Sequence, residues 1–468
     1  MSTSLRRTPP APERTPPLAV VAEPAPSSAP LSDLGPAFRD LPHLALLASG
    51  ADATSDGRWS YLVADPAAWL RWDAAGLRAS GIEPHGRDAF AALAHALGPP
   101  WTGAAPAPFV GGAVGYLAYD VAYALERLPG RCPGPPPAGY LWAGLYDWVV
   151  ARNSATGAAW IVASDWAGRD PARLVAAARD RLNPDGPPAP PTGAGRPTSN
   201  VDRTGYMQWV RTIQAYIAAG DCYQVNVARR ITLPFTGDAL ALYRALVRAH
   251  PAPHAAYLAC GPLTIASVSP ELFVRVDGHR ARTRPMKGTR PRGATPAEDA
   301  QLAAALARSP KDRAENVMIV DVLRNDFGRV CVPGSVHVPA LWDVEAHPSV
   351  WQLVSEVRGE LAAPATAADL LRACSPGGSV TGAPKIRAMQ IIDELEPVRR
   401  GVYCGSLFAL SLTGALTSSI AIRTLQIEGG AAHLHVGGGV VADSDPAAEY
   451  EETVHKARGI LAALGWRE

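Results

Sequence analysis

The chain has 468 residues, of which 47% are hydrophobic, and a formal net charge of +1 at pH 7. This hydrophobic content is typical of a globular protein, and the nearly balanced charge argues against nucleic acid or an anionic membrane as a partner. The six cysteines are scattered without a CxxC pair, so we expect neither a disulfide framework nor a zinc site.

Two proline-rich stretches divide the chain. Residues 1–36 contain nine prolines, a composition typical of a disordered tail, and residues 184–200 have the composition of a Pro/Gly linker. We therefore predict an N-terminal region over 37–183 and a second region over 201–468. No apolar run reaches the roughly 18 residues of a membrane helix, and no apolar segment follows Arg6 and Arg7 as it would in a secretory signal. We expect a cytoplasmic protein that does not associate with membranes.

The second region alternates helical and extended patterns. Residues 204–219 place apolar side chains at helical spacing, and Gly220 follows them. The dipeptide Asp277-Gly278 predicts a hairpin with a two-residue type I′ turn. Helices are expected to begin at Ser309-Pro310 and at Asp445-Pro446, because Ser or Asp before Pro is typical of a helix N-terminus. Other expected elements are strands over 224–228 and 263–268, a helix over 383–395 and a three-strand meander over about 402–441. Antiparallel strands with helices on one side favour an α+β fold.

Lysine is scarce in this chain, since only four of the 44 basic residues are lysines. Unlike a guanidinium, a lysine amine can lose its proton and act as a nucleophile. The predicted hairpin puts Glu271 opposite Arg284 and brings Lys287 close to the same open end. An acid and an amine that face one small molecule can supply a general acid and a nucleophile. A surface salt bridge is the alternative interpretation.

The last predicted helix carries a second cluster. Glu449, Glu452 and Lys456 share one face, and two neighbouring carboxylates repel each other unless a cation neutralises them. Mg²⁺ prefers oxygen ligands, and Glu315 from another helix is a candidate third ligand. A solvated acidic helix face is the alternative. Just upstream, Gly437–Gly439 allows backbone N–H groups to approach an anion.

Long segments of the chain, taken together, resemble the chorismate-utilising enzymes. They occur in the order typical of the family and cover nearly all of the chain from Asn200 onward, with a weaker match at 44–49 and 111–120. The segments are GDCYQVN (220–226), SPELF (269–273), RPMKGTRPR (284–292), AENVMIVDVLRND (314–326), GGSVTGAPKIRAM (377–389), RGVYCGSLF (400–408), SIAIRTL (419–425) and GGGVVADSDPAAEYEETVHKA (437–457). The resemblance implies two antiparallel sheets packed face to face with helices outside, in α/β/β/α layers.

The resemblance also separates the reactions within the family. Members that add water to chorismate have a lysine where this chain has Gln224, and anthranilate synthases have an alanine where it has Lys287. Anthranilate synthases also carry a histidine where this chain has Gln352. The implied reaction is therefore chorismate plus ammonia giving 4-amino-4-deoxychorismate, toward 4-aminobenzoate and folate. Two alternatives remain open here: an anthranilate synthase component I, and an amino-acid-binding regulator derived from the fold.

Residue roles follow from the resemblance. Lys287 would be the nucleophile and Glu271 the acid, with Glu315, Glu452 and Glu449 holding Mg²⁺. The nucleophile must be uncharged, so we expect burial and nearby Arg284 and Arg290 to lower its pKa. The implied substrate-binding residues are Tyr403, Arg423, Lys456, Gly437, Gly438, Gly439, Thr289 and Thr381.

The nitrogen source is expected to come from outside the chain. A glutaminase domain of the common cysteine type has its nucleophile in a Gly-x-Cys-x-Gly setting. Of the six cysteines only Cys132 has these neighbours, Gly130 and Gly134, and it lies in the proline-rich stretch 129–137, without the strand–turn–helix pattern of a nucleophile elbow. We therefore expect a separate glutamine amidotransferase subunit to bind this protein and deliver ammonia.

Overall fold

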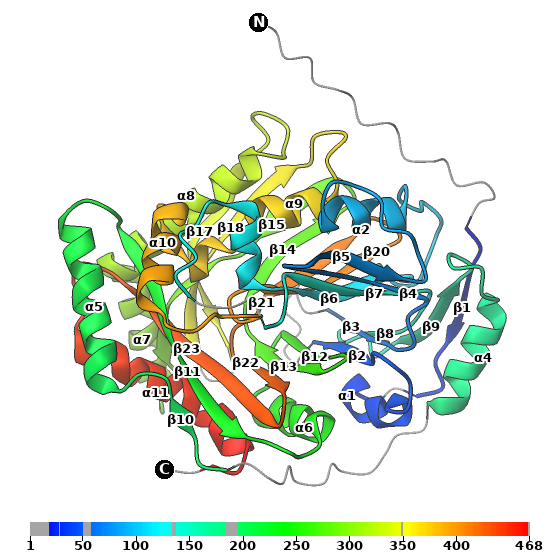
Figure 1. The fold of residues 1–468 in the computed structure, drawn as a ribbon, viewed down its shortest axis with the longest axis horizontal. Helices are drawn as coiled ribbons and strands as arrows, with labels where there is room; N and C mark the ends of the chain where they lie inside the picture. The colour runs from blue at the N-terminus through cyan, green and yellow to red at the C-terminus, as the bar shows by residue number, and fades with distance from the viewer. Residues whose placement is uncertain are drawn as a thin grey trace, which may run out of the picture.

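Two large antiparallel sheets form the centre of the protein (Figure 1). The computed structural model describes residues 18–27, 29–49, 58–132, 137–182, 195–347 and 350–466. Within these residues the first sheet has 12 strands. Their order is β1 (Val20–Pro24), β9 (Ala159–Ser164), β8 (Trp148–Asn153), β3 (Trp59–Val63), β2 (Ala45–Ala48), β12 (His254–Cys260), β13 (Leu263–Ser269), β22 (Thr424–Glu428), β23 (Ala431–Val440), β11 (Gln224–Pro234) and β10 (Thr198–Ser199), while β19 (Gly382–Ala383) also pairs with β11.

The second sheet has 11 strands in the described part of the chain. Their order is β16 (Met286–Pro291), β18 (Val350–Glu360), β15 (Arg280–Thr283), β14 (Leu272–Asp277), β21 (Leu416–Ile420), β20 (Ser406–Ser411), β6 (Gly112–Leu117), β7 (Leu141–Tyr146), β4 (Ala68–Asp73) and β5 (Gly76–Ser80), while β17 (His337–Ala346) pairs with β18.

The helices lie on the outside of the sheets. The first sheet is covered by α1 (Leu31–Leu34), α4 (Pro171–Arg181), α5 (Arg203–Ala218), α6 (Ala239–Ala249), α10 (Lys385–Leu395) and α11 (Pro446–Ala463), and the second by α2 (Ala89–Leu97), α7 (Pro296–Arg308), α8 (Pro310–Gly328) and α9 (Ala367–Cys374). Short α3 (Ala122–Leu125) and the 3₁₀ turns η1 (Gly35–Phe38), η2 (Tyr119–Val121) and η3 (Gly378–Val380) complete the elements. The predicted α+β fold with two face-to-face sheets is confirmed.

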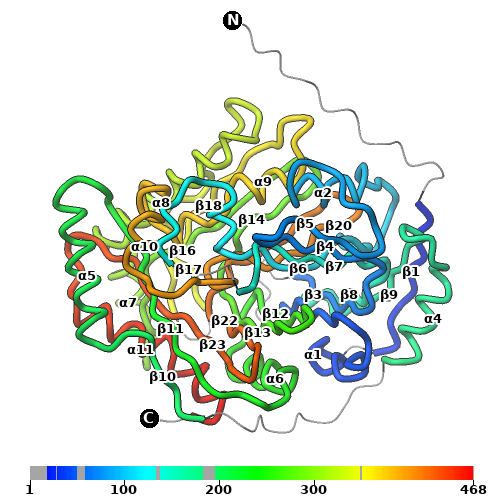
Figure 2. The backbone as a smooth tube through the Cα atoms, viewed as in Figure 1, coloured from blue at the N-terminus to red at the C-terminus, as the bar shows by residue number. Residues whose placement is uncertain are grey.

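Both regions that the sequence separates contribute to the same sheets and the same core. Strand β2 pairs with β12, and β6 pairs with β20, so each sheet joins strands from before and after the linker. Figure 2 shows the blue to cyan segments from before the linker lying among the green to orange segments from after it. One buried cluster, with Val63 and Val114 among its members, fills the space between the sheets, and a second packs the first sheet against its helices.

Local signals predict the site-bearing helices correctly. Ser309 Oγ accepts a hydrogen bond from the Asp312 amide at 3.3 Å, and Asp445 Oδ1 accepts one from the Ala448 amide at 2.7 Å. Proline follows each cap at the first helical position, where its missing N–H costs nothing. Both α8 and α11 therefore begin where the sequence places them.

The predicted hairpin is shifted by one residue. Asp277 pairs with Arg280, so the turn residues are Gly278 and His279 rather than Asp277 and Gly278. Gly278 has a φ of 61°, while His279 is not among the residues with positive φ. Glycine alone at the first central position is typical of a type II′ turn, so the prediction of type I′ is wrong.

Two further predictions need correction. The segment over 402–441 forms four strands rather than three, because β20 and β21 join the second sheet while β22 and β23 join the first. The expected disordered tail over 1–36 is also wrong from residue 18 onward. There Val20–Pro24 forms β1 and pairs with β9, and Leu31 and Leu34 of α1 are buried. Apolar residues among the prolines thus pair at a sheet edge and pack into the core. Residues 1–17 and 183–194 lie outside the described residues.

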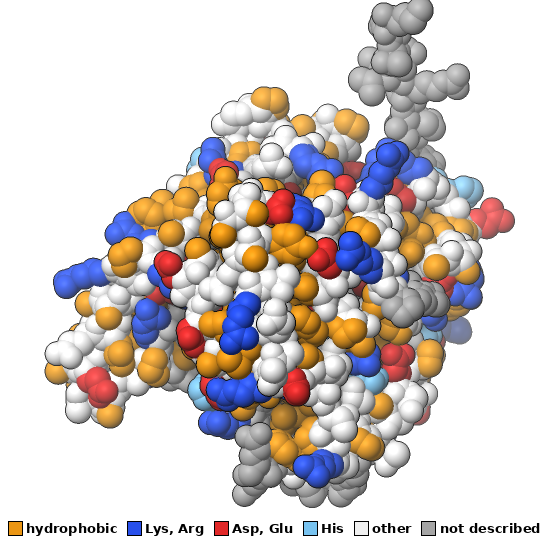
Figure 3. Space-filling view, turned by 60° about the vertical axis from the view of Figure 1, so that its left-hand side comes forward, with side chains coloured by type: hydrophobic (Ala, Val, Ile, Leu, Met, Phe, Trp, Pro, Cys, Tyr) orange, Lys and Arg blue, Asp and Glu red, His pale blue; other side chains and the backbone are white. Residues whose placement is uncertain are grey.

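The surface carries both signs of charge. On the face in Figure 3, Lys and Arg side chains and Asp and Glu side chains are scattered among hydrophobic and other residues, and neither sign of charge forms a continuous patch. In the part of the chain that the structure describes, no helix is both long and apolar enough to cross a membrane.

Candidate active site

Lys287 lies at an irregularity of strand β16. The pairing of β16 with β18 slips between Met286 and Thr289, and Gly288 has a φ of 82°. Such bulges redirect side chains away from the regular alternation of a strand. The Lys287 Nζ lies 3.3 Å from the position that a Cβ on Gly439 would occupy. Among the described residues, this amine makes no ion pair within 4.0 Å.

Burial lowers the pKa of the Lys287 amine, and the charge of Lys456 lowers it further, although the carboxylates of Glu315 and Glu271 oppose the shift. The direction is as predicted, but the expected role of two arginines is wrong. Arg284 pairs with Glu345 and Glu356, and Arg290 pairs with Asp312 at 2.8 Å. Those guanidiniums are neutralised by other carboxylates, so desolvation is the main source of a free amine.

Glu271 stands at the start of β14 and is buried. Its Oε1 accepts a hydrogen bond of 2.7 Å from the Ser379 hydroxyl in turn η3. Burial raises the pKa of Glu271, while the Ser379 hydrogen bond and the Lys287 charge oppose the rise. A carboxyl whose pKa is raised keeps its proton to higher pH, which is the state that a general acid needs.

Helix α11 brings two carboxylates together over strand β23. Oε2 of Glu449 and Oε1 of Glu452 lie 3.0 and 3.4 Å from the position of a Cβ on Gly438. The Ser444 hydroxyl donates to Glu449 at 2.7 Å. Burial raises the pKa of Glu449; burial would also raise that of Glu452, but the charges of Lys456 and Lys287 lower it. A side chain at Gly438 would crowd both oxygens, so glycine lets the two carboxylates approach the strand.

Lys456 and Glu315 border this pair. Lys456 Nζ lies 2.6 Å from Glu452 and donates to the Gly437 carbonyl at 2.8 Å. Glu315 is mostly buried on α8, where burial raises its pKa and Lys311, four residues earlier, lies 4.0 Å away. Within the described residues, no three acidic, histidine or cysteine side chains converge as a preformed metal site.

The fit to Mg²⁺ therefore rests on the Glu449–Glu452 pair and its chemistry. Carboxylate oxygens are hard donors, and Mg²⁺ is usually held by one or two of them with water completing its shell. Because Gly438 has no side chain, both carboxylates can lie close to the backbone and near enough to each other to share one ion. The Glu449–Glu452 pair thus provides the type of ligand that Mg²⁺ prefers.

The predicted substrate-binding residues outside the glycine segment differ in burial and in their contacts. Tyr403 is buried and stacks on His435 with ring centroids 5.2 Å apart. Arg423 is exposed, has a φ of 50°, and its side chain makes no ion pair with any described residue. A guanidinium without a partner is available for a carboxylate. Thr289 is exposed on β16.

Thr381 is placed differently. Its hydroxyl donates to the Gly377 carbonyl at 2.9 Å, and its side chain is fully buried. This bond closes the turn that carries Ser379. The structure thus shows a contact of Thr381 that positions the partner of Glu271.

Sequence reasoning missed Ser379 and Ser444, which hydrogen-bond the two buried acids. Gln224, the residue that distinguishes this chain from the water-adding members of the family, also lies at the site. Its amide is buried and neither polar atom has a hydrogen-bond partner among the described residues, while its Nε2 is 2.7 Å from the position of a Cβ on Gly439.

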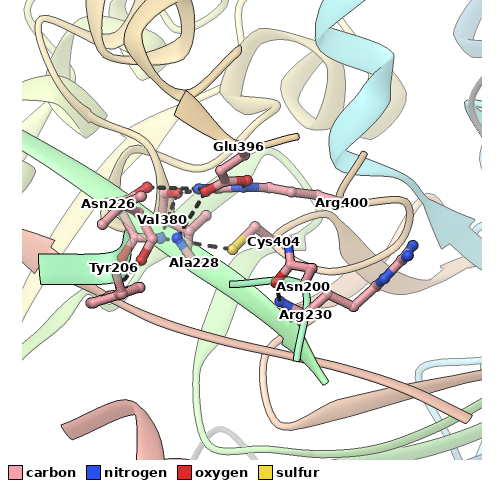
Figure 4. Close-up of polar contacts among 10 residues, drawn as sticks. Asn200, Tyr206, Asn226, Ala228, Arg230, Val380, Glu396, Arg400 and Cys404 are labelled. Atoms are coloured by element: carbon pink, nitrogen blue, oxygen red, sulfur yellow. Dashed lines mark hydrogen bonds and ion pairs between the residues drawn. The ribbon is translucent and has the colours of Figure 1, made fainter. Parts of the chain in front are cut away.

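A buried ion pair anchors the strand beneath the site (Figure 4). Arg400 bonds Glu396 through two nitrogens, at 2.9 and 2.6 Å, and donates to the carbonyls of Val380 and Asn226. The Ala228 amide donates to the same Glu396 at 2.8 Å. The network ties β11, which pairs with the glycines of β23, to the loops before and after α10.

The structure thus brings the Lys287 amine and the Glu449 and Glu452 carboxylates to the Gly437–Gly439 segment, and Glu271 close enough to Lys287 for their charges to interact. A carboxylic acid, an amine of lowered pKa and a carboxylate pair are the groups that acid-assisted displacement on a small anionic molecule would use.

Comparison with known proteins agrees with this chemistry. The sequence pattern of the chorismate binding enzymes matches residues 55–462. The chain belongs to this family.

Its relatives define the position within the family more closely. The chain is 46% identical to aminodeoxychorismate synthase component 1 of Klebsiella aerogenes, over 76% of this chain and 78% of that protein. It is 40% identical to anthranilate synthase component 1 of Streptomyces coelicolor, over 84% of this chain and 81% of that protein. The crystal structure of anthranilate synthase component I from Streptococcus pneumoniae superposes with a TM-score of 0.75 and 28% identity, covering 86% and 92% of the two chains.

Proposed function

We propose that this enzyme converts chorismate and ammonia to 4-amino-4-deoxychorismate. The observation that carries the proposal is the Lys287 amine, which lies beside Gly439 without an ion-pair partner among the described residues and has a lowered pKa. The 46% identity to an aminodeoxychorismate synthase component 1 supports it.

The proposed reaction has two displacements. The neutral Lys287 amine attacks C2 of the ring, the two conjugated ring double bonds each shift by one position, and the C4 hydroxyl leaves as water with a proton from Glu271. The attached nitrogen stays protonated as a secondary ammonium. Ammonia then attacks C4, both double bonds shift back, and the lysine leaves C2 as the free amine. The proton lost by the added ammonia restores Glu271 and balances the reaction.

Other residues hold the substrate. Arg423 is assigned to the enolpyruvyl carboxylate, because a guanidinium can bind a carboxylate through two parallel hydrogen bonds. Tyr403 is assigned to the same group. Lys456 and the Gly437–Gly439 backbone are assigned to the ring carboxylate, with Thr289 at the margin.

We further propose that Glu449 and Glu452, with Glu315, hold Mg²⁺. The ion would neutralise the ring carboxylate and withdraw electrons from the ring. Lys456 now neutralises Glu452, so metal binding requires this ion pair to loosen.

A separate glutamine amidotransferase subunit is proposed as the source of ammonia. Cys132, the one cysteine in a Gly-x-Cys-x-Gly setting, lies between α3 and β7 rather than at a strand-to-helix turn, and burial raises the pKa of its thiol, which disfavours a nucleophilic thiolate. All six cysteines are buried and unpaired, which is typical of a reducing compartment and supports a cytoplasmic location.

Product identification by mass spectrometry tests the proposal. The purified protein is incubated with chorismate, Mg²⁺ and ammonium chloride, or with glutamine in place of ammonium. We expect 4-amino-4-deoxychorismate with ammonium, formed faster as pH rises because only NH₃ reacts, and no product with glutamine. Fluorescent anthranilate would instead identify an anthranilate synthase. Tryptophan binding without any turnover would identify a regulator. Glutamate release matching product formation would refute the need for a partner.

A further inference from the structure

A cavity lies on the side of α11 that faces away from the Glu449–Glu452 carboxylate pair. It has a volume of about 440 Å³ and is bordered by strands β10 and β11, helix α11 and Trp466. Small-molecule sites commonly have volumes of about 300–1,000 Å³ and mainly apolar walls with a few polar groups. This cavity has that size and that character.

Its apolar wall comes from one face of the helix. Tyr450, Val454 and Leu461 line it and are spaced so that they share a side of α11. Glu449 and Glu452 are on another side of the same helix, beside Gly438. The cavity is therefore separate from the candidate active site.

Its charged groups are all cationic. Arg196, Arg229 and Arg458 line the cavity, and none of the described residues that line it is acidic. Arg196 and Arg458 are exposed and form no ion pair with any described residue. Arg229 is buried and held by Thr453 Oγ1 at 2.8 Å, with its guanidinium over the Tyr450 ring. The cavity wall thus favours an anionic group.

We propose that this cavity binds a small aromatic carboxylate, separately from chorismate. The ring system would pack between the apolar face of α11 and Trp466, and the carboxylate would bind Arg458 and Arg196. Guanidinium–carboxylate pairs are frequently bidentate, and aromatic ligands gain both apolar burial and contact with arginine planes. An uncharged ligand of the same shape lacks the main polar interaction.

Calorimetric titration with 2-naphthoate and 2-naphthamide tests the proposal on the full chain in ammonia-free buffer. We expect 2-naphthoate to bind with unchanged affinity in saturating chorismate, and 2-naphthamide to bind at least about tenfold more weakly. Arg458→Gln should weaken 2-naphthoate binding about tenfold or more, and Ala462→Trp, at an exposed position, should block it by filling the cavity. Arg308→Gln, an exposed arginine on α7, is the matched control and should bind as the wild type does.

Three outcomes would overturn the proposal. These are the absence of 2-naphthoate binding, equal affinity for the amide, and displacement by chorismate. Retained binding in both Arg458→Gln and Ala462→Trp would equally place the ligand elsewhere. The turnover of chorismate by each variant serves as the check that it is folded.

Discussion

Two charged centres adjoin the strand pair β11–β23 and are built in opposite ways. In the Arg400–Glu396 centre, the side chains are 1% and 4% exposed, and each guanidinium nitrogen has a partner at hydrogen-bond distance. In the Lys287 centre, the amine lies near several carboxylates but pairs with none of the described ones within 4.0 Å. A satisfied buried pair fixes structure, whereas an unsatisfied buried amine is held in a reactive state.

The comparison also explains why lysine and arginine are divided as they are. Arginine at position 400 forms a bidentate pair and two backbone contacts, which a single ammonium could not reproduce. Lysine at position 287 can lose its proton, which a guanidinium cannot. The scarcity of lysine in the chain is thus informative only where the structure leaves a lysine without a partner.

The largest expected effect is at Lys287. Lys287→Arg retains the charge but removes the nucleophile, so turnover should fall by at least about 10³-fold, as for other catalytic nucleophiles and as for Lys287→Ala. Rates with chorismate and ammonium measure this, and peptide mapping should locate a chorismate-derived adduct on Lys287 when ammonia is withheld. Lys311→Arg, at a half-exposed lysine, is the control. Near-normal turnover of Lys287→Arg would show that Lys287 is not the nucleophile, and the functional contrast between the two centres would fail.

Disrupting the Arg400–Glu396 ion pair should lower the free energy of unfolding rather than the rate of the chemical step. Arg400→Met leaves Glu396 buried without its cation, so the free energy of unfolding should fall by about 3–5 kcal/mol. Urea unfolding measures the change, and the turnover per folded molecule should change far less than in Lys287→Ala. If Arg400→Met retains wild-type stability, the ion pair does not hold β11 in place.

Glu271→Gln removes the proposed acid and should lower turnover by about 10²-fold or more. The same change should stabilise the fold at neutral pH. The pKa of Glu271 is raised in the folded protein, so its contribution to stability is full below the unfolded pKa and is lost as pH rises through the folded pKa. Unfolding free energies at acidic and neutral pH, compared with wild type, measure this. A loss of stability at neutral pH would mean that Glu271 is a structural acid.

The smallest expected effect of a substitution is at Glu452, a proposed metal ligand. EDTA should abolish turnover and Mg²⁺ should restore it, and Glu452→Gln should raise the Mg²⁺ concentration for half-maximal rate by at least about tenfold. Glu451→Gln, at the neighbouring acid that pairs with Arg203, is the matched control and should leave the requirement unchanged. Full activity in metal-free buffer would show that the enzyme needs no metal and that Glu449 and Glu452 are ordinary polar residues of α11.

The sequence alone determined the family, the fold class and the identity of the proposed reactive residues. Long ordered segments carry the resemblance, and helix signals such as Ser309-Pro310 and Asp445-Pro446 act within a few residues of the element that they start. Lys287, Glu271, Glu449 and Glu452 can be named from the sequence, because their chemistry is a property of the residue type.

Only the tertiary structure decided which strands pair and which side chains meet. The four strands of 402–441 divide between two sheets, and β1 joins a sheet edge far from it in sequence, because pairing depends on long-range packing that no local pattern encodes. The hydrogen bond from Ser379 to Glu271 joins residues 108 apart in sequence. Burial, which moves the pKa values of Lys287 and Glu271 toward their proposed roles, likewise exists only once the two sheets close over them.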